Sequence, residues 1–342
     1  MIYLSSQLLR NKRYKKETQN FVDILKEYKV LYNFIDGTKD IWVRDFMPIQ
    51  SHNGPFYSFK YEPSYLIGRE DLRTDYKTTY GHLHNRTPQY SKINLDGGNV
   101  VFSPSGELAI ISERVFSENS KKSRDEIINS LSKTLRTKII FIPCLSPSED
   151  MTGHADGMVH FVDDKTVIVN ESLFANDFEW KIKDILLKNG LNVIEFPFYL
   201  SGDSMSAEGC YLNIIETENI VFVPQFSNPK DEIALQKAHE IFHKKAVPVP
   251  LKNIAKDGGG LRCITWITSD AVKRFDKYSE ENYRIDKCPV CGKNIIYYYN
   301  DLCEICFWEE DGSISDEWDY SPANGASLTE YRENYNKNKI LL

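Results

Sequence analysis

The sequence has no long apolar run and no excess of positive charge. Its longest apolar runs have the length of a β-strand, whereas a helix that crosses a bilayer needs about 20 such residues. The 42 lysines and arginines are outnumbered by 49 aspartates and glutamates, and the formal net charge is -7. Such a chain has no overall positive field to hold a polyanion. We therefore expect neither a membrane nor a nucleic acid as a partner.

A secretory signal is also lacking, because the apolar residues 2–9 are followed by positive charge instead of being preceded by it. Cysteines are few, seven in all, and four of them form two C-x-x-C pairs eleven residues apart: Cys288, Cys291, Cys303 and Cys306. Four thiolates at this spacing are typical of a tetrahedral structural zinc site in a reducing compartment. We therefore expect a cytoplasmic, zinc-binding protein. Disulfide bonds or a metal-free thiol cluster are the alternatives.

Apolar residues are plentiful enough to build a real core: 41% of the chain is hydrophobic and 13% is aromatic. Residues 273–287 are highly charged and precede the cysteine pairs, which indicates a linker. We expect a main domain at 1–275, a linker at 276–287 and a small cysteine-rich, zinc-ribbon-like domain at 288–342, with a short strand at 295–299. So short a domain buries little core and needs its metal to fold.

The main domain repeats one order of elements: helix, strand, glycine-rich turn and strand. Its turns carry Asp45, Asp96, His154, Glu208 and Cys263, whose spacings by subtraction are 51, 58, 54 and 55. So regular a period indicates an array or a ring of α/β units, not a doubly wound sheet. If five units surround one axis, their turns converge at its centre. We expect helices at 16–29, 123–135, 179–189 and 230–243, and strands at 2–5, 30–35, 108–111, 138–143, 158–162, 166–170, 192–197, 211–215, 220–224 and 247–250.

The glycine-rich turn before Cys263 is the first candidate for chemistry. Three glycines at 258–260 let a substrate approach the main chain closely, and the thiol that follows can face a pocket. Taken alone, the turn is more typical of a cysteine buried in the core. Arg44 and Asp45 interrupt an apolar run at 40–49, and alone they are typical of an ion pair at the end of a strand.

Four motifs follow one another along the main domain: Trp42-x-Arg44-Asp45-x-x-Pro48, Asp96-Gly97-Gly98-Asn99, Gly153-His154-x-Asp156 and Gly258-Gly259-Gly260-x-x-Cys263. In order and interval they resemble the agmatine deiminase and bacterial (Porphyromonas-type) peptidylarginine deiminase family of the guanidino-modifying, or pentein, superfamily. The resemblance implies the pentein fold, a five-bladed α/β propeller of ββαβ-type repeats around a pseudo-fivefold axis. It also implies a hydrolase that releases ammonia from a guanidino compound without a catalytic cofactor.

By motif position, the resemblance implies a role for each catalytic residue. Cys263 is the nucleophile and His154 is the general acid and base. Asp45 and Asp156 hold the guanidinium, and Asp96 stands where the family has an acidic residue. The chemistry supports these roles, because two carboxylates can grip a planar guanidinium while a thiolate attacks its carbon and a histidine moves protons.

The other expected substrate-binding residues are Trp42, Arg44 and Arg262. Two positions depart from the family: Arg262 stands where histidine is common, and Cys210 stands where a small residue is usual. These departures concern the substrate more than the chemistry. Two alternatives follow, namely transfer of the amidino group to an amine and, because Arg262 can occupy the carboxylates, a pentein that binds without turnover.

Two further motifs stand outside this picture. His239-Glu240-x-x-His243 matches the H-E-x-x-H pattern of zinc proteases, but no third ligand is apparent and the segment fits a surface helix of the fifth repeat. The tail resembles the small cysteine-rich CPCC domain of bacteria, with a valine in place of the second cysteine of the Cys-Pro-Cys-Cys signature. That resemblance implies no function for the tail.

Overall fold

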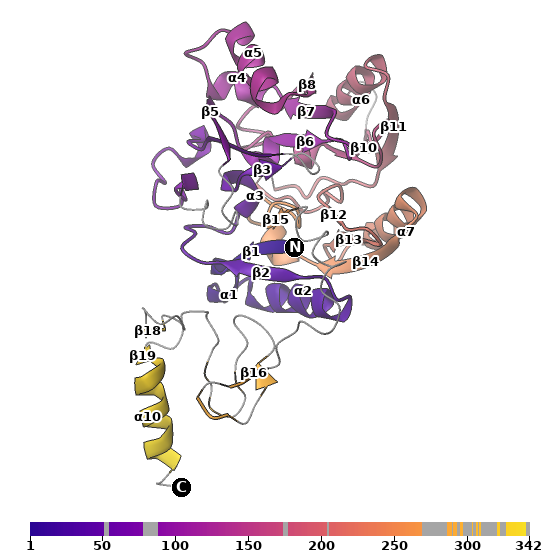
Figure 1. Cartoon of the computed structure of the whole chain (residues 1–342). Coiled ribbons are helices and arrows are strands. Elements are labelled where there is room, and N and C mark those ends of the chain that lie inside the picture. Colours follow the sequence, from indigo (N-terminus) through magenta and orange to yellow (C-terminus); the bar gives the residue numbers. More distant parts are fainter. Residues whose placement is uncertain are drawn as a thin grey trace. The chain divides into compact units, whose positions relative to one another are not determined.

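The computed structural model describes residues 1–50, 55–77, 88–173, 177–203 and 205–268, and in the C-terminal part residues 286–288, 290–292, 295–296, 303, 306, 308, 320–321 and 326–339. The chain divides into two compact units, Met1–Asp270 and Ala271–Leu342, and each is described by itself (Figure 1). Most of the linker expected at 276–287 lies outside the described residues. No helix in the described ranges is both long and apolar enough to span a membrane.

Five three-stranded sheets share one plan in the described part of the first unit. In each sheet the middle strand pairs antiparallel with one neighbour and parallel with the other. The sheets are β15-β1-β2, β3-β4-β5, β6-β7-β8, β9-β10-β11 and β12-β13-β14. The strands are β1 (Ile2–Ser5), β2 (Tyr32–Ile35), β3 (Ile49–Gln50), β4 (Phe56–Lys60), β5 (Gln89–Asn94), β6 (Val100–Phe102), β7 (Leu108–Ser112), β8 (Lys138–Ile142), β9 (Val159–Phe161), β10 (Thr166–Asn170), β11 (Asn192–Phe196), β12 (Ile215–Glu216), β13 (Ile220–Gln225), β14 (Lys245–Pro250) and β15 (Thr265–Ile267).

In four of the five sheets an α-helix lies between the parallel strands, as is usual for such a crossover. Between β4 and β5 the described residues contain 3-10 turns but no α-helix. The expected helix at 123–135 shows why the helices form. Ser123 and Glu126 make a reciprocal capping box at its start, and Ile127, Leu131 and Leu135 recur at helical spacing and are buried. The helices are α1 (Gln7–Arg10), α2 (Lys15–Glu27), α3 (Val43–Phe46), α4 (Arg114–Glu118), α5 (Arg124–Leu135), α6 (Phe178–Lys188), α7 (Lys230–Phe242) and α8 (Lys252–Ala255), with 3-10 turns η1 (Ser64–Leu66), η3 (Gly97–Asn99) and η4 (Ala155–Gly157).

The sheet built on β1 joins the two ends of this unit. β1 pairs in parallel with β2 and antiparallel with β15, with Leu4 opposite Thr265. Trp266 of β15 is 1% exposed and its indole Nε1 donates to the backbone oxygen of Pro48 at 2.7 Å. The turn that carries Cys263 is therefore fixed beside the start of the chain.

Two expected elements differ from the structure. The strand expected at 211–215 begins only at Ile215, because the preceding residues form turns in which Tyr211 and Ile214 are buried. These turns direct Asn213 inward. The run around Arg44 and Asp45 is the single helical turn α3 rather than the end of a strand, and Asp45 faces His154.

The described residues of the second unit form two short strand pairs and one helix. β16 (Asp286–Lys287) pairs with β17 (Ile295–Ile296), and β18 (Tyr320–Ser321) pairs with β19 (Ala326–Ser327), which leads into α10 (Leu328–Lys339). The strand expected at 295–299 is described only for its first two residues. Trp308 is 0% exposed and packs edge-on against Tyr331, with ring centroids 5.2 Å apart.

Candidate active site

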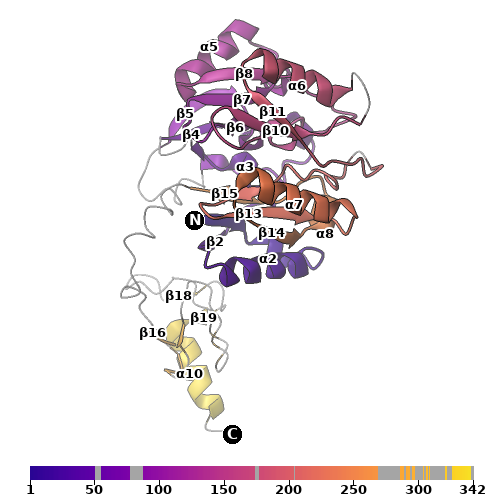
Figure 2. The ribbon, with the colours of Figure 1, turned by 90° about the vertical axis from the view of Figure 1, so that its right-hand side faces the viewer.

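The candidate site is built from segments that each precede the strand that pairs antiparallel with the middle strand of a sheet. α3 precedes β3, η3 precedes β6, η4 precedes β9, and turns precede β12 and β15. α3 contacts both η3 and β15, and η3 contacts η4. In both ribbon views α3 lies between the sheet of β6, β7 and β8 and the sheet that contains β15 and β2 (Figures 1 and 2). Equivalent positions of five repeats thus bring distant motifs together.

His154 lies between two carboxylates from different sheets. Its Nε2 is 2.8 Å from Asp96 Oδ2, and its Nδ1 is 3.5 Å from Asp45 Oδ1. The Tyr65 hydroxyl donates to the same Asp96 oxygen at 2.9 Å. Burial alone lowers the pKa of His154, but Asp45, Asp96 and Asp156 together outweigh it and raise this pKa to about 10. His154 therefore holds a proton at neutral pH.

Cys263 is held by Asn213. The Asn213 Oδ1 atom accepts from the Cys263 backbone N at 3.2 Å and from its Sγ at 3.4 Å, and also from the Arg262 backbone N at 2.7 Å. Burial raises the pKa of the Cys263 thiol well above its usual range, and Asp156 and Asp45 raise it further. In the free protein this cysteine is a thiol.

Asp45 and Asp156 each present a buried carboxylate oxygen with no hydrogen-bond partner, Oδ1 of Asp45 and Oδ2 of Asp156. The two side chains are 8% and 2% exposed. Burial raises the pKa of Asp45 to about 8, although His154 opposes the rise. Burial also raises the pKa of Asp156, and Arg262, His154 and Arg44 oppose it. Such orphaned acceptors are costly unless a donor arrives.

Two arginines supply positive charge beside these carboxylates. Arg262 Nε lies 3.7 Å from Asp156 Oδ2, and the Arg44 backbone N donates to the Cys263 backbone oxygen at 3.2 Å. Burial, followed by the charge of Arg262, lowers the pKa of Arg44 to about 9. Arg44 is therefore still a cation at neutral pH.

Two glycines are required by close approach. A Cβ atom on Gly98 would lie 2.7 Å from both Asp45 Oδ1 and His154 Nδ1, and one on Gly259 would lie 2.2 Å from the Trp42 ring. Real Cβ atoms do not approach so closely. The glycine-rich turns thus let Asp45, His154 and the Trp42 indole pack directly on backbone.

The structure brings together the side chains or backbone of all eight expected site residues of the main domain, and it adds Asn213 and Tyr65. A sequence feature could have indicated Asn213 as a site residue, because it is a lone amide in an apolar run. No sequence feature indicated Tyr65, since it lies in an irregular stretch. Glu208, the landmark of the fourth repeat, accepts a hydrogen bond from Ser206 instead, at 3.4 Å. Cys210 lies close by and donates to the Gly157 oxygen at 3.3 Å.

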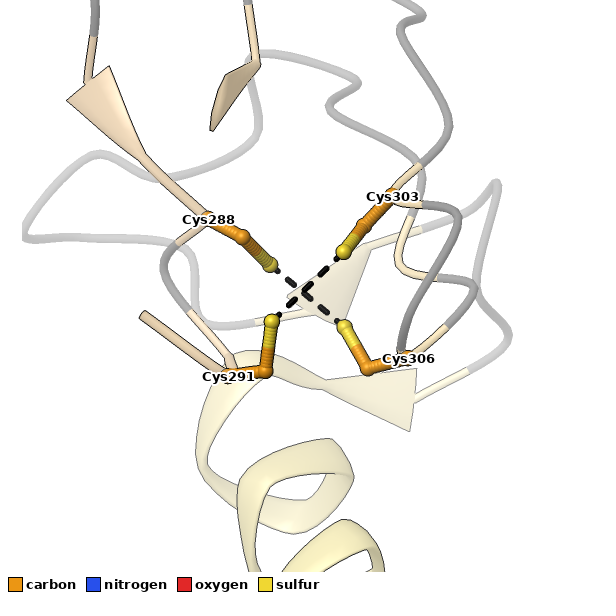
Figure 3. Close-up of side chains that lie close together, drawn as sticks. All are labelled: Cys288, Cys291, Cys303 and Cys306. Carbon is orange, nitrogen blue, oxygen red and sulfur yellow. Dashed lines mark hydrogen bonds between the residues drawn. The ribbon is translucent and has the colours of Figure 1, made fainter. Parts of the chain in front are cut away.

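The four cysteines of the second unit form one cluster (Figure 3). Their Sγ atoms lie within 4.8 Å of one another, with 3.4 Å between those of Cys288 and Cys306 and 3.6 Å between those of Cys291 and Cys303. Four sulfurs that point to one centre fit a tetrahedral ion with sulfur bonds of about 2.3 Å.

The H-E-x-x-H segment does not form such a site. His239 Nδ1 hydrogen-bonds the backbone oxygen of Lys244 at 2.7 Å, and His243 caps α7 in the left-handed conformation, at a φ of 53°. Among the described residues, the four cysteines are the one group of three or more ligands close enough to hold a metal.

One curated protein is similar to part of the chain. A curated protein of Latilactobacillus sakei subsp. sakei, named "Putative agmatine deiminase", is 26% identical over 211 residues, 50% of this chain and 56% of that protein. The chain thus spans little more than half the length of this curated relative.

Two solved structures show the same fold. The agmatine deiminase of C. jejuni matches with a TM-score of 0.62 at 18% identity, over 78% of this chain and 92% of that one. The agmatine deiminase of Enterococcus faecalis matches with a TM-score of 0.62 at 17% identity, over the same shares. These neighbours place the first unit in the pentein fold.

Family models match both parts of the chain. The cysteine-rich CPCC model matches residues 286–338, and the model of Porphyromonas-type peptidyl-arginine deiminase matches residues 8–268. Because the match to residues 8–268 covers most of the sequence, the chain belongs to the Porphyromonas-type peptidyl-arginine deiminase family.

Proposed function

We propose that this chain is a hydrolase that converts a guanidino compound, such as agmatine, arginine or a peptidylarginine, to a ureido product and ammonia. One observation carries the proposal: Asp45 and Asp156 each offer a buried, unpartnered oxygen beside Cys263 and His154. A guanidinium is planar and only donates, so it supplies the hydrogen bonds that both oxygens lack. A neutral donor could make such hydrogen bonds, but it would not balance the charge of two buried carboxylates.

The reaction proceeds through a covalent intermediate. The Cys263 thiolate attacks the guanidinium carbon and forms a C–S bond. One C–N bond then breaks, and ammonia leaves with a proton from His154. Water attacks the thiouronium that remains while His154 takes its proton, and the C–S bond breaks to release the ureido product and the thiolate. No cofactor is needed for these steps.

The two proposed catalytic groups are prepared differently: His154 before the substrate binds, and Cys263 when it binds. His154 is already protonated, because its pKa is raised to about 10, and the first stage needs that proton. The Cys263 pKa is raised partly by Asp156 and Asp45. A bound guanidinium offsets the charge of both carboxylates, so it lowers the pKa of the thiol and favours the attacking thiolate.

Hydrolysis also needs a place for water. A cavity of about 10 Å³ adjoins His154 and is lined by polar side chains that include Tyr65, Asp96 and Asn99. That volume is enough for about one water molecule beside His154.

The fold supports a central site. We propose that the five sheets are the blades of a five-bladed propeller around a pseudo-fivefold axis. The shared plan of the sheets supports this, and so does the pairing of β1 with β15, which joins the ends of the unit. The candidate active-site segments all precede the antiparallel edge strand of a blade, so we expect them to gather at one end of this axis.

A screen of guanidino compounds, free and peptidyl, tests the function. We expect ammonia and a ureido product in equal amounts from at least one compound, and none with Cys263→Ser, because a serine hydroxyl is hardly ionised at neutral pH. If the amidino group were instead transferred to an added amine, the chain would be an amidinotransferase and not a hydrolase. If substrates bound without formation of either product, the chain would be a binding protein without turnover.

We further propose that the cysteine cluster holds one structural zinc. Cys288, Cys291, Cys303 and Cys306 would hold the ion, which would link the two cysteine pairs beside the small buried cluster that contains Trp308 and Leu328. Metal analysis of protein purified without chelator should find about one zinc per chain. Cys303→Ser should lose it and Cys210→Ser should keep it. Absence of metal, or zinc retained by Cys303→Ser, would refute the site.

A further inference from the structure

Arg262 lies beside Asp156 and is largely buried. Its side chain is 17% exposed, and its Nε, 3.7 Å from Asp156 Oδ2, makes no hydrogen bond. Its backbone N donates to Asn213, the same residue that holds Cys263. The backbone that carries this guanidinium is therefore fixed next to the nucleophile.

His160, on β9, fixes the far end of this guanidinium. Arg262 Nη1 lies 3.5 Å from His160 Nδ1. A guanidinium has no acceptor, so His160 must receive this contact with an unprotonated Nδ1. Burial lowers the pKa of His160 well below its usual range, and Arg262, Arg44 and Lys244 lower it further. His160 is thus a neutral acceptor with its proton on Nε2.

We propose that Arg262 is a positioning residue: anchored by His160, it keeps the Asp156 carboxylate ionised and aimed at the substrate's guanidinium. The inference rests on the proposed function, since it concerns how the same site receives a cation. It gives a role to the residue that departs from the histidine common in the family.

The two guanidinium-holding carboxylates then differ in how their charge is balanced. Asp45 faces His154, which gains and loses a proton. Asp156 faces Arg262, whose charge is permanent. One carboxylate can thus follow the proton transfers of His154 while the other holds the substrate throughout. At about 4 Å, buried opposite charges interact far more strongly than in water.

Several charged groups surround the pair. Asp156 interacts electrostatically with Arg262, His154, Arg44 and Asp150, and also with Asp45 and Cys263. Besides Asp156 and His160, Arg262 acts on Arg44 and on Glu216, whose carboxylate lies 3.0 Å from Lys244 Nζ. Lys244 is therefore a cation of the same neighbourhood that does not face Asp156, and it provides a matched control.

Alkylation of Cys263 tests the proposal without turnover. Chloroacetamidine is a cation and chloroacetamide is its neutral counterpart; in both, the thiolate displaces chloride and forms a C–S bond. Peptide mass spectrometry follows the rate of each reaction at Cys263 as a function of pH. Because both reagents react with the same thiolate, the fraction of ionised thiol cancels in the ratio of the two rates. The ratio therefore reports the negative charge of the carboxylates that receive the cation. Asp156→Asn gives its value without one carboxylate.

As the pH is lowered, the carboxylates become protonated and the ratio of the two rates falls. Removal of Arg262 should change the pH at which this fall occurs. In Arg262→Gln the Asp156 pKa rises, so the fall should begin about one pH unit or more above that of wild type. Arg262→Lys keeps the charge but not the planar fork, and should restore most of the wild-type profile. His160→Phe should shift it in the direction of Arg262→Gln, and Lys244→Gln should leave it unchanged. Melting temperatures show whether each variant is folded.

Two results would overturn the inference. One is an unmoved profile in folded Arg262→Gln, or in Arg262→His if the glutamine variant does not fold. The other is a ratio that rises at every pH, because Arg262 would then compete with the cation for Asp156. The proposed function fails in a different way, by a wild-type protein that shows no preference for the amidine and releases no ammonia.

Discussion

At the scale of single residues, the site gathers charge that a stable core would exclude. Asp45, Asp96 and Asp156 are all less than 9% exposed, and Arg44 and Arg262 lie beside them. Burying like charges together is costly, and the raised pKa values of Asp45 and Asp156 express that cost. Such strain is typical of groups arranged for a ligand.

Replacing Asp45 or Asp156 by asparagine should abolish function but not the fold. Each change turns an acceptor into a donor that faces the donors of the substrate, and kcat/KM should fall roughly 100-fold or more. The melting temperature should hold or rise, because the ionised forms of both groups are disfavoured in the fold.

Asp231→Asn provides the contrast. Asp231 accepts from the Tyr211 hydroxyl at 2.6 Å and from the backbone N atoms of Phe226 and Asn228, so its loss should lower the melting temperature and spare turnover. Unfolding of Asp45→Asn with retained ammonia release would show that Asp45 is structural.

His154 should stabilise the fold in a pH-dependent way. Its pKa is about 10 in the folded chain and near 6.5 when unfolded. The protonated form therefore stabilises the fold in full below pH 6.5, and this contribution is lost as the pH rises through about 10. The melting temperature of His154→Gln should fall below that of wild type most at pH 6 and least above pH 10. A difference that is constant with pH would contradict the raised pKa.

At the scale of elements, short turns position the chemistry. Gly98, in η3, allows Asp45 and His154 to approach its backbone, whereas Gly157, in η4, has open space where a Cβ would lie. Two glycines in equivalent turns of neighbouring repeats thus have different requirements.

Gly98→Ala should displace Asp45 or His154 and reduce kcat/KM at least about tenfold, with a stability loss of about 1–3 kcal/mol. Gly157→Ala should change both quantities little. Assays of ammonia release and thermal melts on the two variants make the comparison. Equal activity of both would mean that the packing against Gly98 does not set the catalytic geometry.

At the scale of the whole molecule, closure of the first unit depends on one strand. β15 contributes Trp266, which is 1% exposed and contacts the rings of Tyr3 and Phe56. A chain ending at residue 270 keeps β15, and a chain ending at residue 264 keeps Cys263 but lacks this strand.

We expect the chain that ends at 270 to melt cooperatively and to retain activity, because the first unit holds its own core. The chain that ends at 264 should be unfolded, since loss of one buried tryptophan alone costs about 3–5 kcal/mol. Circular dichroism melts of both chains test this. A folded shorter chain would show that β15 is dispensable, and an insoluble longer one would show that the second unit is required.

Local patterns in the sequence predicted most elements and named the residues that the structure gathers at the candidate site. Helices such as α5 follow from capping and periodicity, and Cys263, His154, Asp45 and Asp156 follow from four motifs. The strand expected at 211–215 was wrong for its first four residues. These residues form turns that place Asn213 beside Cys263, and their burial does not alternate as in a strand. Tyr65 could not be predicted, since only the folded loop brings its hydroxyl to Asp96.

The sequence by itself determined the family, the repeated order of elements and the residue types of the chemistry, because these depend on neighbours along the chain. Only the tertiary structure decided which groups meet. His154 lies between Asp96 and Asp45, and Arg262 faces Asp156 and His160. These contacts join separate repeats, so their distances and charges arise only when the sheets pack. For the same reason, the role of Arg262 could not be read from its place beside Cys263.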